Sequence, residues 1–218
     1  MQAKTKSDMI KDTPISKEEQ NALTPSSVLQ DLVEGNERFV SNNLQEKDNK
    51  TLVFQTIGGQ YPKAVILSCI DSRVPVETIF DQTIGDIFVA RVAGNFENTD
   101  ILGSLEYSCK AAGSKLVLVL GHESCGAVKA ACDGVELGNI TAMLENIMPA
   151  VKMASLEVEG KADSTNAKFV AKAVKNNVKL TMTRIRERSP ILKEMEKKGE
   201  INIVGGIYKL STGSVELL

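Results

Sequence analysis

The chain has 218 residues, 42% of them apolar, and its 26 Lys and Arg against 28 Asp and Glu give a net charge of −2. This length and apolar content predict one domain with its own buried core. The balanced charge excludes a polybasic nucleic-acid-binding protein, and no apolar run approaches the roughly 18 residues that cross a bilayer. Aromatic residues amount to 4% and include no Trp, so we do not expect a surface that stacks on bases or sugars.

The N-terminus is polar and mixed in charge. We expect residues 1–24 to form a flexible segment and residues 25–218 to form a single folded domain. Residues 1–17 contain no hydrophobic stretch of the kind found in signal peptides or membrane anchors. We therefore expect a cytoplasmic protein, with a periplasmic location as the alternative if a leader has been removed.

Helical spacing of apolar residues begins directly after this segment. Thr24 and Pro25 are typical of a helix start, and the pattern predicts a helix from there to about residue 41. Residues 42–59 are polar and predict a loop or a second short helix.

Strands and helices then alternate along the chain. Continuous apolar runs predict buried strands over residues 64–67, 86–90 and 115–120. Helices are expected over residues 99–112, 137–156, 166–188 and 189–199. A last strand with a hairpin-like end is expected over residues 201–210, with a β-bulge at Gly205 and Gly206. The predicted fold class is therefore α/β: a central, mostly parallel sheet flanked by helices, with an N-terminal helical arm.

Two of the predicted strands end in residues that bind metals. Cys69 follows the first strand, and His122 and Cys125 follow the third. The carboxyl ends of neighbouring parallel strands meet at one edge of a sheet, so these side chains are expected to lie close together. A set of two Cys and one His suits tetrahedral zinc with one position left open, which is the catalytic pattern. The sequence therefore predicts one zinc ion per chain.

The other two cysteines have a simpler interpretation. At this chain length four cysteines do not indicate a disulfide framework, and we expect all of them to be reduced. Cys109 and Cys132 are expected to be small buried residues. The alternative is that one of them closes the metal shell and makes the site structural. For His122 the alternative is an ordinary core histidine.

Three segments together resemble the β-class carbonic anhydrases. They are CIDSRVP at residues 69–75, RVAGN at 91–95 and GHESCGAV at 121–128, and the resemblance extends from residue 29 to the C-terminus. It implies zinc-dependent, reversible hydration of CO2 to bicarbonate and a proton, by attack of zinc-bound hydroxide on CO2. It also implies a catalytic domain over residues 25–218 and a homodimer, with a tetramer as the larger alternative. From the charge and the apolar runs described above, we expect no nucleic-acid or membrane partner.

The resemblance also implies roles for individual residues. Asp71 and Arg73 match a dyad in which the Arg holds the carboxylate as a hydrogen-bond acceptor for the nucleophile. For Phe88, Tyr107 and Gly126, which match the substrate pocket, the alternative is ordinary packing. The implied residues are Cys69, His122 and Cys125 as zinc ligands, Asp71 and Arg73 as the catalytic dyad, and Gln60, Phe88, Tyr107 and Gly126 as the substrate pocket.

The chain departs from the family pattern at two positions. Ile66 replaces a Trp found in members that bicarbonate inhibits and in which the Asp becomes a fourth zinc ligand at low pH. Arg91 and Tyr208 still match other parts of that inhibitory pocket, but the change at Ile66 favours an open zinc site. Val92 stands where many members have Asn.

Two alternative functions stay open at this point. The same scaffold can hydrolyse COS or CS2, and the sequence does not separate these substrates from CO2. A non-catalytic protein that binds zinc or bicarbonate is the other alternative. The pairing of Asp71 with Arg73, together with Gln60, favours the enzyme, because a structural zinc site needs none of them.

Overall fold

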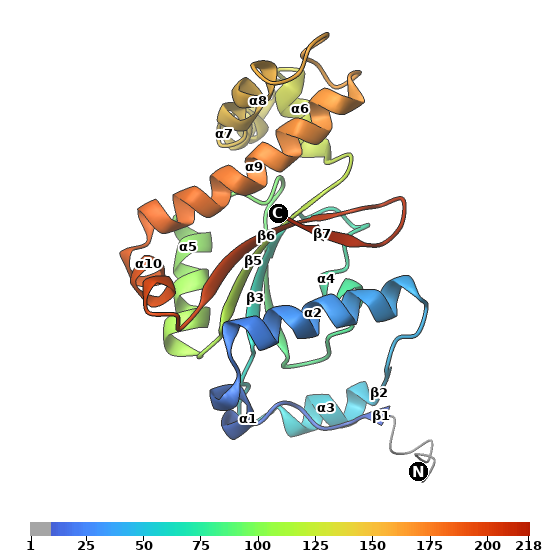
Figure 1. Cartoon of the computed structure of the whole chain (residues 1–218), viewed down its shortest axis with the longest axis vertical. Helices are drawn as coiled ribbons and strands as arrows, with labels where there is room; N and C mark the ends of the chain where they lie inside the picture. Colours follow the sequence, from blue (N-terminus) through green and yellow to red (C-terminus); the bar gives the residue numbers. More distant parts are fainter. Residues whose placement is uncertain (1–9) are drawn as a thin grey trace.

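The computed structural model describes residues 10–218, and Figure 1 shows a central sheet between two groups of helices. The strand order is β4-β3-β5-β6-β7. All neighbours are parallel except β7, which pairs with β6 in the antiparallel direction. The strands are β3 (Ala64–Ser68), β4 (Ile87–Arg91), β5 (Leu116–His122), β6 (Asn202–Tyr208) and β7 (Val215–Leu217).

Helices cover both faces of this sheet. α5, α6, α8, α9 and α10 pack on one face, and α2 and α4 pack on the other. Because both faces are covered, β3 and β5 are buried along their whole length, which explains their continuous apolar sequences. The helices are α1 (Lys17–Ala22), α2 (Pro25–Val40), α3 (Asn49–Gln55), α4 (Val76–Ile79), α5 (Thr99–Glu106), α6 (Gly126–Cys132), α7 (Gly138–Glu145), α8 (Met148–Ser155), α9 (Ala167–Arg188) and α10 (Pro190–Lys197). Within residues 10–218 no helix is both long and apolar enough to cross a membrane.

The predicted elements are largely confirmed. Each of the four predicted strands is present within two residues at either end, and the helices expected over 166–188 and 189–199 are α9 and α10. The predicted helix over 137–156 is wrong in its middle, where α7 ends at Glu145 and α8 begins at Met148. Pro149 has no N–H to donate to the carbonyl group of Glu145, so one continuous helix cannot form.

The predicted bulge at Gly205 and Gly206 is also wrong. Both residues pair with Val119 and Leu120 of β5 in unbroken register. A Cβ atom on Gly205 would lie only 2.8 Å from Cγ1 of Val178 on α9. Glycine is therefore needed here for the close approach of α9 to β6.

The N-terminal elements belong to the fold. Residues 10–24 of the expected flexible segment contain β1 (Ile10–Lys11) and α1, and residues 1–9 of that segment lie outside the described residues. Gln20 of α1 is fully buried, and its amide donates to the carbonyl oxygens of Pro62 and Ala112, each at 2.8 Å. β1 pairs with β2 (Glu46–Lys47). The predicted arm, α2, packs against the sheet of its own chain.

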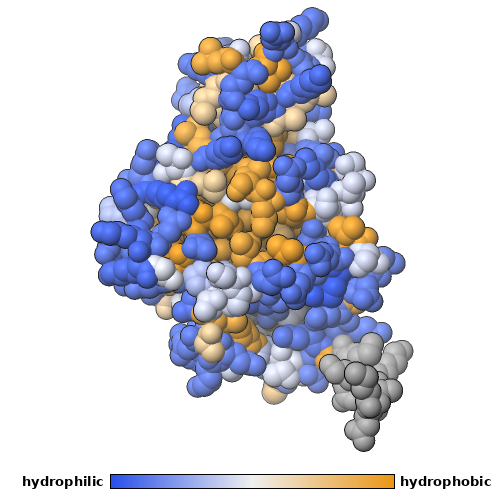
Figure 2. Space-filling model, in the orientation of Figure 1, coloured by the Kyte–Doolittle hydropathy of each residue, from blue (hydrophilic) through white to orange (hydrophobic). Residues whose placement is uncertain are grey.

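The helices leave part of the sheet uncovered near its edge strand β7, away from the buried strands β3 and β5. In Figure 2 an apolar area lies at the centre of this view, over the strands between α9 and α2. A cavity of about 310 Å³ between α2 and β7 is lined mainly by apolar side chains, among them Leu29, Val33 and Leu217. Apolar surface is therefore left open beside the edge strand β7.

The direction in which successive strands are added to the sheet reverses between β3 and β5. The chain runs from β3 through α4 to β4 on one side, then returns through α5 to β5 on the other side of β3. Ligands of open α/β sheets bind at such a switch point, beyond the carboxyl ends of the strands. Cys69 directly follows β3, and His122 is the last residue of β5.

Candidate active site

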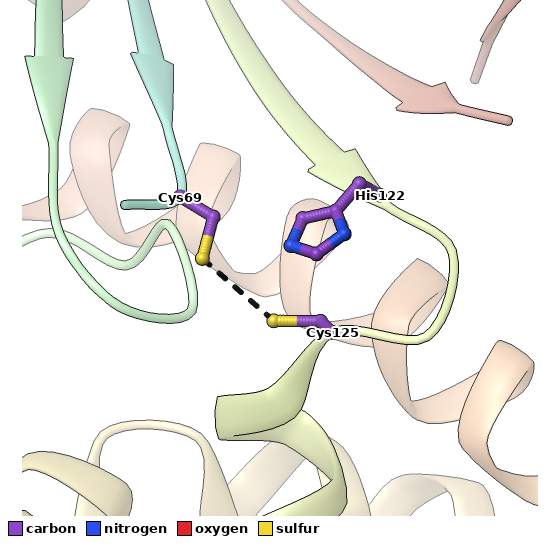
Figure 3. Close-up of side chains that lie close together, drawn as sticks. All are labelled: Cys69, His122 and Cys125. Atoms are coloured by element: carbon purple, nitrogen blue, oxygen red, sulfur yellow. Dashed lines mark hydrogen bonds between the residues drawn. The ribbon is translucent and has the colours of Figure 1, made fainter. Parts of the chain in front are cut away.

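The three predicted metal ligands meet at this switch point (Figure 3). Their donor atoms all lie within 4.8 Å of one another, and Sγ of Cys69 is 3.9 Å from Sγ of Cys125. Two sulfur atoms on one tetrahedral zinc ion, each at about 2.3 Å from it, lie about 3.8 Å apart. The donor set and its spacing therefore fit zinc.

His122 presents one free nitrogen to this group. Its Nδ1 lies 2.9 Å from the carbonyl oxygen of Glu123, so Nδ1 carries the proton and donates it to that oxygen. Nε2 consequently has a lone pair, and it finds no hydrogen-bond partner among the described residues although His122 is fully buried. An unpaired buried acceptor costs free energy unless something binds it, and a metal ion would do so.

The two thiols interact strongly. The hydrogen bond from the Cys125 thiol lowers the pKa of the Cys69 thiol to about 4, and the neighbouring His122 side chain and the backbone N–H of Gly94 lower this pKa further. The same interaction raises the pKa of Cys125, whose thiol holds the remaining proton. Metal binding would displace that proton, because thiolates are the form of Cys that binds metals.

Asp71 and Arg73 lie beside the ligands as predicted. Nε and Nη2 of Arg73 donate to the two carboxylate oxygens of Asp71 at 2.9 and 2.8 Å, and the Arg73 backbone N–H donates to Oδ1 at 2.9 Å. These bonds hold the pKa of the Asp71 carboxyl well below its usual range. Oδ2 of Asp71 is 3.8 Å from Nε2 of His122, so an ionised carboxylate lies next to the metal-binding group.

Arg91 supports the turn that carries Cys69 and Asp71. Its Nε donates to the carbonyl oxygen of Cys69 at 2.8 Å, and its Nη2 donates to that of Asp71 at 2.6 Å. The sequence alone matched Arg91 only to an inhibitory pocket. Its position directly after the predicted strand over residues 86–90 was the sequence signal for this second role, and the structure places it opposite Ser68 of β3.

The predicted substrate pocket is not assembled within one chain. Gly126 directly follows the ligand Cys125, but Gln60 lies before β3, at the opposite end of that strand from Cys69. Five strand residues span about 16 Å. Phe88 pairs with Val65 near the start of β3.

Phe88 and Tyr107 lie together on the surface instead. Their ring centroids are 6.1 Å apart, and both line a cavity of about 580 Å³ beside the edge strand β4. Tyr107 begins a π-helical turn, Tyr107–Ala111, that continues α5, and it is 60% exposed. Phe88 is partly buried and packs against the core, as the alternative interpretation expects, whereas Tyr107 does not.

The remaining cysteines do not join the metal-binding group. Among residues 10–218, the only cluster of three or more potential ligands is the one formed by Cys69, His122 and Cys125. Cys109 is buried in the core, where burial raises its pKa to about 12, and Cys132 is partly buried. The interpretation of both as packing residues fits this placement, and neither closes the metal shell.

Known carbonic anhydrases are similar to this chain in sequence. The family model for carbonic anhydrase matches residues 64–215. Carbonic anhydrase 2 of Mycobacterium tuberculosis is 36% identical over 201 residues, which cover 88% of this chain and 92% of that protein. A carbonic anhydrase of Mycolicibacterium smegmatis is 32% identical over 199 residues, with coverage of 88% and 93%.

Solved structures are similar in fold. The tetrameric β-carbonic anhydrases of the filamentous ascomycete Sordaria macrospora match with a TM-score of 0.69 at 22% identity, over 88% of this chain and 94% of theirs. The β-carbonic anhydrase CcaA matches with a TM-score of 0.66 at 25% identity, over 88% of this chain and 92% of its own. Sequence, fold and the grouping of two Cys and one His agree, and the chain belongs to the β class of the carbonic anhydrase family.

Proposed function

We propose that this protein catalyses the reversible hydration of CO2 to bicarbonate and a proton, with one zinc ion per chain held by Cys69, His122 and Cys125. The observation that carries the proposal is the convergence of these three buried donors beside an ionised carboxylate. A purely structural site would have four protein ligands and no need for a fixed Asp71.

Zinc bound there supplies Lewis acidity, which makes water a nucleophile near neutral pH. Asp71 orients that nucleophile. Arg73 occupies one lone-pair direction on each carboxylate oxygen, so the carboxylate cannot rotate and stays ionised. A free lone pair on Oδ2, which faces His122, accepts a hydrogen bond from the attacking water and turns the water's own lone pair toward the carbon of CO2.

The released proton must leave without a histidine relay. His122 is the only His in the chain, and its two nitrogen atoms are committed to the Glu123 carbonyl group and to the metal. We propose that water and external buffer carry the proton away.

We further propose that the active unit is a homodimer. Gln60, Phe88 and Tyr107 match the family's substrate pocket, yet they lie far from the ligands of their own chain. A dimer would resolve this if Gln60 and Phe88 of the partner subunit approach the metal-binding group. The exposed apolar surface and the tetrameric relatives from Sordaria macrospora support assembly.

Stopped-flow CO2 hydration at about pH 8.5, with zinc measured on the same sample, tests the proposal. We expect fast hydration and one zinc ion per chain. Cys132→Ser is the matched control for Cys69→Ser, and only the latter should lose zinc and activity. One zinc ion per chain without hydration would overturn CO2 as the substrate, and COS would then be assayed.

A further inference from the structure

Gly94 connects a buried helix residue to a ligand sulfur atom. Its N–H donates to Sγ of Cys69 at 3.4 Å, and its carbonyl oxygen accepts a hydrogen bond from Nδ2 of Asn177 at 2.7 Å. Asn177 lies in the middle of α9, more than eighty residues further along the chain. The N–H that contacts Cys69 belongs to the peptide group between Ala93 and Gly94. The carbonyl group that contacts Asn177 belongs to the next peptide group, between Gly94 and Asn95.

The peptide group between Gly94 and Asn95 is held from both ends: the N–H of Asn95 donates to the carbonyl oxygen of Val92 at 2.9 Å within the turn, and Asn177 holds the Gly94 carbonyl oxygen from α9. Gly94 has φ +83°, and a Cβ atom there would lie 2.4 Å from Cδ1 of Ile147, so only glycine fits. Glycine is also the residue with the greatest backbone freedom. The direction of its N–H therefore depends on the contacts made by the adjacent peptide groups.

Asn177 is poorly suited to its position unless its amide has a purpose. It is 1% exposed and lies between the core residues Val174 and Val178. Asn lowers helix propensity, and burying an amide costs free energy that few hydrogen bonds can offset. The bond to Gly94 is the one that Asn177 makes through its side chain in the described structure, and its Oδ1 has no partner there. An apolar residue would fill this space at lower cost.

We propose that Asn177 is a positioning residue for the metal site: it fixes the Gly94 peptide so that the N–H of Gly94 donates to the ligand sulfur of Cys69. A hydrogen bond to a thiolate withdraws negative charge from the sulfur atom and holds it in place. This inference rests on the proposed metal site and adds a residue from α9 to it.

Cobalt-loaded protein gives a readout that activity does not. Thiolate-to-Co²⁺ charge-transfer absorption moves to lower energy when the sulfur loses a hydrogen bond. We expect Asn177→Ala to shift this band to lower energy and to bind Co²⁺ about ten-fold more weakly in chelator competition. Val178→Ala is the matched control, because it creates a cavity at the next residue of α9 without touching the hydrogen bond, and it should lower stability while leaving the band and the affinity unchanged.

Several outcomes would overturn the inference. Asn177→Ala with the wild-type band and affinity would do so, as would an equal shift in Val178→Ala. If Asn177→Ala does not fold, Asn177→Leu, which fills the same space without a hydrogen-bond donor, is compared instead: a band at lower energy than wild type supports the inference, and the wild-type band contradicts it. Failure of the unmodified chain to bind any metal would overturn the proposed site as well, whereas normal binding unaffected by Asn177→Ala overturns this inference alone.

Discussion

Arg73 donates one hydrogen bond to each carboxylate oxygen of Asp71, from Nε at 2.9 Å and from Nη2 at 2.8 Å. This fork geometry fixes the plane of the carboxylate as well as its charge. Charge and orientation are therefore separable properties of Asp71, and a variant can remove one while keeping the other.

Arg73→Leu should remove the orientation alone. Without Arg73 the pKa of Asp71 rises toward its ordinary value of about 3.9, so the carboxylate is still ionised at pH 8. We expect kcat for CO2 hydration at pH 8 to fall on the order of 100-fold, as for a lost positioning interaction, with zinc content unchanged. Wild-type kcat in this variant would show that orientation by Arg73 is not required.

Activity should rise between pH 7 and 9. Two thiolates offset the +2 charge of zinc more than three neutral imidazoles do, so the activating deprotonation is expected above the value of about 7 known for three-His sites. Asp71 does not contribute to this rise. Arg73 lowers the pKa of the Asp71 carboxyl, so Asp71 is protonated only at strongly acid pH and is ionised across the whole range from pH 6 to 9. The measurement is kcat at constant ionic strength from pH 6 to 9, and a flat profile of the zinc-loaded enzyme would contradict the expectation.

Turnover should depend on buffer concentration. His122 is the one histidine of the chain, and it is fully buried in the candidate metal-binding group, so no imidazole is left to carry protons to solvent. We expect kcat at fixed pH to increase with buffer from about 1 mM upward and then level off. The check is a buffer series at constant ionic strength, and full turnover at trace buffer would disprove the idea.

Gly205→Ala should destabilise the fold. The added Cβ would lie 2.8 Å from Cγ1 of Val178 and 2.9 Å from Sδ of Met182, so α9 must move away from β6. We expect a loss of about 1–3 kcal/mol in the free energy of unfolding, measured by urea titration. Gly103→Ala on α5 is the matched control: no atom lies within 4 Å of the added Cβ, and stability should be unchanged or up to about 1 kcal/mol higher.

The metal-binding group was accessible to sequence reasoning because parallel strands align their carboxyl ends. Cys69 and His122 each end a fully buried apolar run, and two such runs in a parallel sheet meet at one edge. The break at Pro149 was also readable, since a missing N–H has a fixed position in the helix ladder.

The positions of Gln60 and Asn177 relative to the metal-binding group could not be predicted, because they depend on three-dimensional distances that a sequence motif does not give. Gln60 lies near Cys69 in sequence, yet an intervening strand carries it to the far end of the sheet. Asn176 and Asn177 are two consecutive polar residues inside a helix with periodic apolar positions, which is a weak sign of a special role. The partner of Asn177, Gly94, can be identified only from the packing of α9 on the sheet.

The position of the ligands also has a mechanical consequence. Cys69 and His122 are more than fifty residues apart in the chain. Cys69 follows β3 and His122 ends β5, and these two strands are neighbours in the sheet. A metal ion joining them closes a long loop in the unfolded chain, as a disulfide would, and by the chain-entropy relation a loop of this length is worth up to about 4 kcal/mol. Zinc would then stabilise the fold as well as take part in the reaction. In the metal-free protein, local unfolding is expected to begin where β3 and β5 lie side by side.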